Sequence, residues 1–229
     1  MRYVLTIILS VGFLFSSSLA DEKIELKDQK DKESYSLGYQ FGQSLKSQGV
    51  DINLDIYASG IKDAFGGKEP QMSQEEIRAT IMELQKKVMA AQQKALKEQA
   101  TKNLSESRAF LAKNGKTEGI KTLASGLQYK VLAEGSGKMP KADDTVIVHY
   151  KGALIDGTEF DSSYKRGQPA TFQVKGVIKG WTEALQLMKE GSKWQLFIPP
   201  ELAYGERGAG STVPPNSTLI FEVELLTIK

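Results

Sequence analysis

The sequence contains no cysteine and only one histidine, His149, among its 229 residues. The lack of cysteine excludes disulfides, thiol catalysis and attachment of a lipid through an N-terminal cysteine, while it leaves the redox compartment open. One histidine cannot build a metal site of several histidines. The formal net charge of +2 is too small to indicate binding to nucleic acid or to an anionic membrane. Catalysis must therefore rely on few acid–base groups, and the sequence indicates neither a cofactor nor a metal.

Long apolar runs are also scarce. The one clear run, from Val4 to Phe15, follows Arg2 and precedes a small-residue stretch that ends at Ala20. This pattern is typical of a secretory signal, and the run is short for a bilayer span, which needs about 20 residues. The sequence predicts a signal peptide at 1–20, a mature chain from about Asp21 without a membrane span, and export to the periplasm or cell exterior. An uncleaved N-terminal anchor is the alternative.

The mature chain begins with a charged stretch, residues 21–33, which we expect to be disordered. Ser34 then precedes a helical pattern to Leu45, in which two glycines share a face with aromatic residues and indicate close approach of a second backbone. A second short helix is predicted from a cap at Asn53 to Phe65. Two helices this short cannot enclose a core alone. We therefore expect region 21–72 to form a homodimer through residues 34–66.

The third helix has the clearest local signals. Ser73 and Glu76 form a capping box, Met72 and Ile77 form the matching hydrophobic staple, and no breaker follows until Gly115. These signals predict a helix over residues 73–114, about 60 Å long. Residues 90–102 are mostly Ala, Gln and Lys, which favours a solvated stalk over a full-length coiled coil. The alternative is a helix packed along its whole length on the next domain.

Residues 121–229 change from helical to alternating periodicity. Strand patterns are expected at residues 127–131, 146–150, 171–174, 194–198 and 219–226, with a hairpin turn at Asp156-Gly157. The one helical pattern begins at Trp181 and places Ala184, Leu185 and Met188 on its inward face. The fold class is therefore α+β, an antiparallel half-barrel sheet wrapped on one short helix, preceded by an all-α region and a long helix. Trp181 either floors an apolar pit or is an ordinary core tryptophan.

Four motifs in this region, in order and spacing, resemble those of the FKBP family of peptidyl-prolyl cis/trans isomerases. They are Val148-His149-Tyr150-x-Gly152, Gly157-x-x-Phe160-Asp161-Ser162-Ser163, Val177-Ile178-x-Gly180-Trp181, and Tyr204-Gly205 followed by Pro214-Pro215-Asn216-Ser217-x-Leu219. The signal peptide, the segment around Tyr35–Leu45 and the long helix further resemble the Mip (macrophage infectivity potentiator) branch, which is exported, dimeric and associated with virulence.

The resemblance implies isomerase activity on proline-containing polypeptides, assistance to the folding of exported proteins, and inhibition by macrolides of the FK506/rapamycin type. It implies that Trp181 is the floor of a proline pocket, that Ile178 donates its backbone N–H and Tyr204 its hydroxyl to substrate carbonyls, and that Asp161 lies beside the twisting amide. The other implied binding residues form the walls and opening: Tyr150, Phe160, Phe172, Val177, Phe221, and Val213 as a cap. Arg166 either holds Asp161 in place or is an ordinary surface arginine, and His149 is expected to be structural.

Two positions depart from the family pattern, Ala170 and Ala209, where other members often carry larger side chains. These two departures leave open which substrates the protein prefers and how strong its catalytic activity is. The glycines of residues 205–210 do not match a phosphate-binding loop, because no Lys-Ser/Thr follows them. Another class of function also fits the long helix and dimer region, namely a chaperone or surface-binding clamp that uses the same pocket without catalysis. A purely structural coiled-coil protein is disfavoured by the gap in the heptads.

Overall fold

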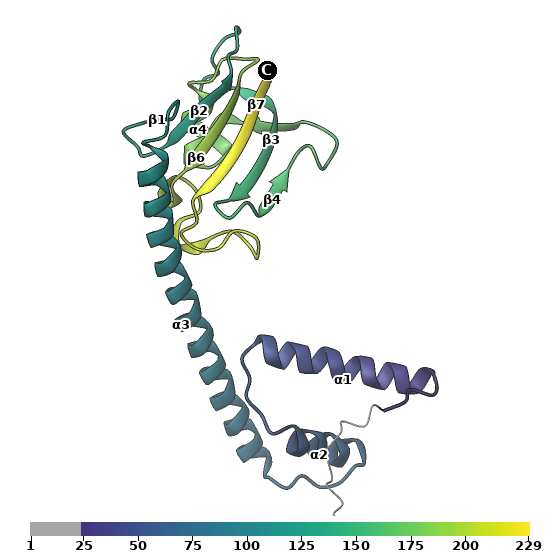
Figure 1. Cartoon of the computed structure of the whole chain (residues 1–229). Helices are drawn as coiled ribbons and strands as arrows, with labels where there is room; N and C mark the ends of the chain where they lie inside the picture. Colours follow the sequence, from purple (N-terminus) through teal and green to yellow (C-terminus); the bar gives the residue numbers. More distant parts are fainter. Residues whose placement is uncertain (1–23) are drawn as a thin grey trace, which may run out of the picture. The chain divides into compact units, whose positions relative to one another are not determined.

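The structure, a computed structural model, describes residues 24–229 (Figure 1). The predicted signal peptide, residues 1–20, lies outside the described residues. The described chain falls into two compact units, one ending at Lys68 and the other spanning Glu69–Lys229. Within residues 24–229, no helix is long and apolar enough to cross a membrane.

The first unit contains α1 (Gln29–Ser47), which begins earlier than the sequence predicted. Disorder was expected up to residue 33, but the Asp28 side chain accepts a hydrogen bond from the backbone N–H of Asp31 and caps the helix. Gln29 also donates to Glu33 one turn later. A charged sequence rich in Lys, Glu and Gln is compatible with a helix once a cap is present. The prediction of disorder was therefore wrong from Gln29 onward.

The second helix, α2 (Leu54–Phe65), has the predicted bounds. The side chain of Asn53 accepts hydrogen bonds from the N–H groups of Asp55 and Ile56, and Gly66 follows the last turn. Neither α1 nor α2 contains a buried residue. Most of their large apolar side chains are exposed, including Phe41 at 60% and Phe65 at 95%.

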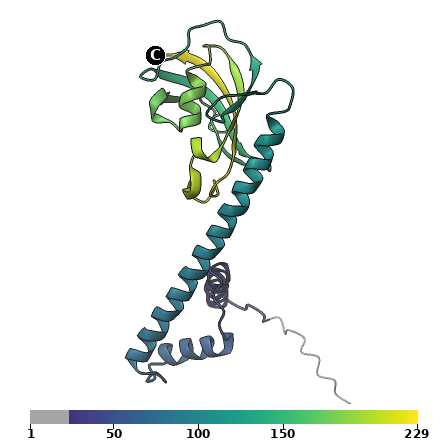
Figure 2. The ribbon, with the colours of Figure 1, turned by 90° about the vertical axis from the view of Figure 1, so that its left-hand side faces the viewer.

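The long helix α3 (Gln74–Asn114, 41 residues) forms with the predicted capping box, in which Ser73 and Glu76 bond each other reciprocally. Its C-terminal turns lie against the sheet domain of the same unit (Figure 2). The contact starts earlier than the sequence indicated, because the Ala100 carbonyl accepts a hydrogen bond from Asn216. The prediction that residues 90–102 are solvated is therefore wrong for the end of that stretch. The alternative, a helix packed along its whole length, is not observed either.

All pairings in the sheet are antiparallel, and the strand order is β1-β2-β6-β7-β3-β4. Strand β5 pairs with the first half of β3, and β4 pairs with the second half. The strands are β1 (Lys121–Thr122), β2 (Gln128–Ala133), β3 (Thr145–Leu154), β4 (Glu159–Ser162), β5 (Ala170–Gln173), β6 (Lys193–Ile198) and β7 (Leu219–Ile228). The two-residue β1 is too short for a periodic signal and was not predicted. Val174, predicted to end a strand, instead begins a 3-10 turn, Val174–Gly176.

The core lies between the sheet and α4 (Lys179–Leu185), around which the sheet curves (Figures 1 and 2). Alternate residues of β3 and β7 are buried, as the period of a strand requires. From α4 and the turn after it, Trp181, Ala184, Leu185 and Met188 are buried against them. The predicted α+β class, with a helical region and a long helix preceding the sheet, is therefore confirmed.

Candidate active site

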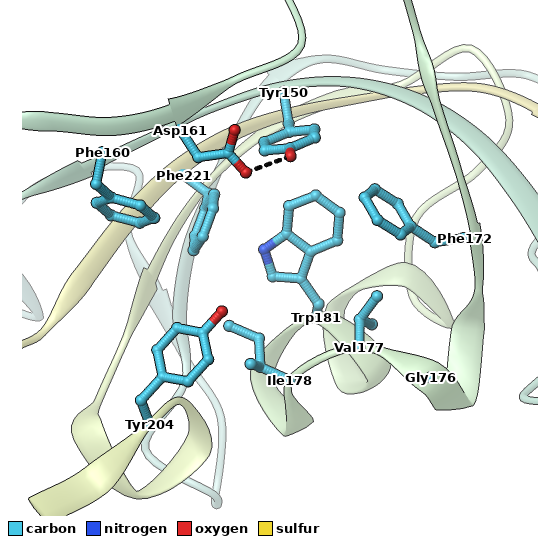
Figure 3. A pocket seen from close by; sticks show the side chains of 10 residues that line it. All are labelled: Tyr150, Phe160, Asp161, Phe172, Gly176, Val177, Ile178, Trp181, Tyr204 and Phe221. Atoms are coloured by element: carbon cyan, nitrogen blue, oxygen red, sulfur yellow. Dashed lines mark hydrogen bonds between the residues drawn. The ribbon is translucent and has the colours of Figure 1, made fainter. Parts of the chain in front are cut away.

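A cavity of about 430 Å³ opens between the start of α4 and the sheet. Most of its lining is aromatic or aliphatic (Figure 3). The lining residues are Tyr150, Phe160, Asp161, Phe172, Gly176, Val177, Ile178, Trp181, Tyr204 and Phe221. A concave apolar site with a few polar groups at its edge is the usual form of a small-ligand site.

Trp181 lies in the first turn of α4 at the centre of this cavity and is 3% exposed. Three other rings meet it nearly at right angles: Tyr150 at 5.2 Å between centroids, Phe172 at 5.7 Å and Phe221 at 5.2 Å. Edge-to-face pairs at such distances are favourable beyond the apolar area they bury. The indole is therefore held rigidly and presents an apolar surface to the cavity.

The position of α4 depends on Gly180. A Cβ atom at this residue would lie 2.5 Å from Cγ2 of Ile198, which is itself buried in β6. Carbon atoms pack at about 3.5–4.0 Å, so a larger residue would push the helix off the sheet. The hydroxyl of Thr182 also donates to the Val174 carbonyl and joins α4 to the turn before it. These two contacts set the depth of the indole.

The polar edge of the cavity is a network of three side chains. The Tyr150 hydroxyl donates to Oδ2 of Asp161 and accepts a hydrogen bond of 2.7 Å from Nη2 of Arg166. Arg166 also pairs with Oδ1 of Asp161 through Nη1, and its guanidinium lies 5.3 Å from the Tyr150 ring centroid. Each member contacts the other two, so all three are fixed in position.

The network also sets the protonation states. Burial opposes ionisation of Asp161, but the hydrogen bonds from Tyr150 and Arg166 outweigh it and the pKa of Asp161 is lowered. Burial, and then the hydrogen bond to Asp161, raises the pKa of Tyr150. At neutral pH the site therefore holds a carboxylate and a protonated phenol.

Two residues on the other side of the cavity carry hydrogen-bond donors, Tyr204 and Ile178. The Tyr204 side chain is 42% exposed, and its hydroxyl points toward Ile178 and Trp181 (Figure 3). Ile178 precedes the first turn of α4, and no described residue accepts a hydrogen bond from its backbone N–H. Both residues line the cavity, and neither donor is used within the described chain.

Most of the residues singled out from the sequence come together here, and two lie elsewhere. Arg166 does not line the cavity but binds two residues that do. Val213, expected as a cap, is 4% exposed and not part of the lining; it packs in the core and pairs with Ala209. Gly176 was missed, because a glycine contributes no side-chain pattern to a sequence. Neither Ala170 nor Ala209 lines the cavity.

His149 lies outside the cavity, with Nδ1 3.0 Å from the Ser163 hydroxyl and its ring stacked on Tyr164. Within residues 24–229, no group of three or more acidic or histidine side chains could hold a metal ion. The cavity contains no histidine to activate a nucleophile. The arrangement is suited to binding and electrostatic stabilisation rather than to covalent catalysis.

Comparison with known proteins identifies the family. Residues 136–226 match the family described as FKBP-type peptidyl-prolyl cis-trans isomerase, and residues 30–131 match the domain amino terminal to it. The peptidyl-prolyl cis-trans isomerase Mip of Coxiella burnetii is 46% identical over 100% of this chain and 99% of its own length. The outer membrane protein MIP of Legionella longbeachae is 44% identical over 96% of this chain and 94% of its own. The crystal structure of FkpA from Escherichia coli superposes with a TM-score of 0.74 at 43% identity, covering 90% of this chain and 99% of that one. The chain belongs to the FKBP-type peptidyl-prolyl cis-trans isomerases, as its motifs predicted.

Proposed function

We propose that this isomerase seats the proline ring of a polypeptide on Trp181, between the aromatic walls, and eases rotation about the preceding amide bond. The observation that carries the proposal is the cavity itself, whose floor and walls are mostly aromatic and aliphatic side chains and whose one charged lining group is Asp161. A proline ring is compact and apolar, so burying it against Trp181, Phe172 and Phe221 is favourable.

The reaction needs no bond to be broken. Its barrier of about 18–20 kcal/mol comes from amide resonance, which is lost when the bond twists. A site accelerates the rotation when it binds the twisted amide more tightly than the planar one. An acceleration of about 10⁴-fold requires about 5.5 kcal/mol of such preference. A dry cavity disfavours the charge-separated planar amide, and two or three fixed hydrogen bonds contribute the remainder.

In this proposal the polar groups have distinct roles. The Ile178 N–H and the Tyr204 hydroxyl donate to carbonyl groups that flank the proline and hold the chain while the bond turns. The Asp161 carboxylate lies beside the twisting amide. Arg166 and Tyr150 keep that carboxylate ionised and in place through their hydrogen bonds.

The test is the rate at which the full-length protein converts cis X–Pro peptides to trans. We expect Tyr204→Phe and Asp161→Ala each to lower kcat/KM by about tenfold, the effect of losing one hydrogen bond to a charged or reacting group. Tyr164→Phe is the matched control, because Tyr164 is equally exposed and its hydroxyl bonds Glu224 outside the cavity. Equal activity of wild type, Tyr204→Phe and Asp161→Ala would reject these roles.

The first unit supports a homodimer through residues 34–66. Phe41 and Phe65 are among several large apolar side chains exposed on α1 and α2, where neither helix buries a residue. An apolar surface of this kind is stabilised by a self-complementary partner. Sedimentation should give a dimer at micromolar concentration, and Phe41→Glu with Phe65→Glu should give a monomer. Leu132→Glu, at an exposed apolar residue of β2, is the control; a monomeric wild type would contradict the proposal.

We further propose that the protein is exported to the periplasm or cell surface of a Gram-negative bacterium and assists folding there as a chaperone. The outer-membrane name of one relative and the apolar run at residues 4–15 support this location. Suppression of aggregation that persists in Trp181→Ala would place the chaperone surface outside the cavity. If Trp181→Ala and Asp161→Ala both abolish the suppression of aggregation, the same pocket serves chaperone and isomerase activity. A wild-type protein that suppresses aggregation but does not isomerise X–Pro peptides would favour the non-catalytic clamp.

A further inference from the structure

Asn216 has an unusual backbone conformation. It is the only non-glycine residue within 24–229 with a positive φ, 53°, and it is 7% exposed. Asparagine tolerates this left-handed conformation better than most residues, but it is still costly and persists only where the surroundings fix it. The contacts of Asn216 show what fixes it.

Asn216 joins three separate segments of the second unit. Its backbone N–H donates to the carbonyl of Gly205 at 2.8 Å. Its side-chain amide donates to the Ala100 carbonyl of α3 at 3.2 Å, and its own carbonyl accepts from the Ser107 hydroxyl of α3 at 2.8 Å. Asn216 is thus bonded to the long helix on one side and to the loop after Tyr204 on the other.

Ser107 is the anchor on the helix side. It is 1% exposed and is the one buried residue of α3. Besides donating to Asn216, its hydroxyl accepts the backbone N–H of Thr218 at 3.0 Å. Asn103, one turn earlier, donates to the carbonyl of Pro215 at 2.6 Å. The segment 215–218 is therefore held to α3 by several short hydrogen bonds.

The loop that carries Tyr204 has little other support from α3. Glu206 and Arg207 face the helix across a cavity of about 610 Å³. Within residues 24–229, no hydrogen bond or ion pair joins residues 204–210 directly to α3, so the loop is linked to the helix through Asn216. Gly205 is the residue directly after Tyr204, and its carbonyl is the atom that Asn216 holds.

We propose that Ser107 and Asn216 are positioning residues, which hold the Tyr204 hydroxyl over the proline pocket through Gly205. The C-terminal turns of α3 then help to position a group of the proline pocket, in addition to packing against the sheet domain of the second unit. This inference rests on the proposed role of Tyr204 as a donor to the substrate.

A double-mutant cycle on the full-length protein tests it, because such a cycle detects whether two residues act together. Ser107→Ala should lower kcat/KM by about fivefold in the wild-type background and by less than about twofold in the Tyr204→Phe background. Ser105→Ala, two residues away on the exposed side of α3, should leave kcat/KM unchanged in both backgrounds. Equal losses from Ser107→Ala in the two backgrounds, or no loss in either, would overturn the inference.

Asn216→Gly provides a second variant that keeps the fold, since glycine adopts φ of 53° without strain. It removes only the bond to Ala100, and we expect a loss of about twofold to threefold in kcat/KM that again disappears with Tyr204→Phe. Trypsin should also cut faster after the exposed Arg207 in both variants, because the loop is released. Full activity of Tyr204→Phe would overturn this inference and the proposed role of Tyr204 together. Normal activity and cleavage of Ser107→Ala and Asn216→Gly, with an impaired Tyr204→Phe, would overturn this inference alone.

Discussion

Gly152 offers the sharpest test of the aromatic walls. It lies buried in β3 opposite Phe221 of β7. A Cβ atom at this position would lie 2.6 Å from Cε1 of Phe221 and 2.8 Å from Cζ of Phe160. The two rings form an edge-to-face pair with centroids 5.5 Å apart. The substitution Gly152→Ala therefore inserts a methyl group between two walls of the pocket.

The required movement follows from ordinary contact distances. Carbon atoms pack at about 3.5–4.0 Å, so each ring must move by about 1 Å. Overpacking of this kind in a core costs about 1–3 kcal/mol. Gly152 does not have a positive φ, so the alanine tests space and not backbone conformation. We expect the free energy of unfolding to fall by that amount and kcat/KM for an X–Pro peptide to fall with it.

The matched control is Gly176→Ala. Gly176 also lines the cavity, but the nearest atom to a Cβ there, Cβ of Gln173, is 3.7 Å away, which is an ordinary contact. Urea unfolding and the isomerisation assay on both variants distinguish a clash of the new methyl group with the rings from an effect of replacing any cavity glycine by alanine. Wild-type stability and activity of Gly152→Ala would refute the packing of Phe160 against Phe221 described above.

Three further outcomes follow from the structure. The pKa of Asp161 is lowered in the folded protein, so its ionised form stabilises the fold above the unfolded pKa of about 3.9, and this stabilisation is lost as the pH falls through the folded pKa. Asp161→Asn should therefore lose less stability than wild type when the pH is lowered below about 4. Parallel plots of unfolding free energy against pH for the two proteins would contradict this. Ser73→Ala removes the capping box of α3 and should lower the free energy of unfolding, measured in urea, by about 1 kcal/mol, whereas the control Ser105→Ala should leave it unchanged. Identical urea unfolding curves for the two variants would show that the cap contributes nothing. Gly180→Ala should lower the melting temperature and shift the tryptophan fluorescence, because the added methyl group pushes α4, and Trp181 with it, away from Ile198. An unchanged fluorescence spectrum would contradict the close contact between Gly180 and Ile198.

The sequence predicted the fold class and the family well because the relevant signals are local. The capping box of Ser73 and Glu76, the Asn53 cap and the hairpin turn at Asp156-Gly157 each act within a few residues. Strand alternation around Val146–Tyr150 similarly reports which face is buried. The motifs also predicted most of the residues that line the cavity.

What the sequence could not supply depends on contacts between distant segments. The hydrogen bonds of Asn216 to Ala100 and Ser107 join residues more than 100 positions apart, and no periodicity indicates them. The start of α1 was missed because one aspartate cap outweighed a disorder-like composition. The expected place of Val213 over the cavity was inferred from family resemblance alone, whereas in the structure it is buried against the core.

The proposed activity requires that the cavity around Trp181 is the place where the prolyl bond rotates. The most direct measurement is the isomerisation rate of an X–Pro peptide by the full-length protein, with and without a macrolide of the FK506/rapamycin type. We expect clear acceleration that falls to the uncatalysed rate as the macrolide saturates the cavity. Acceleration that persists at saturation, or no acceleration by the protein alone, would contradict it.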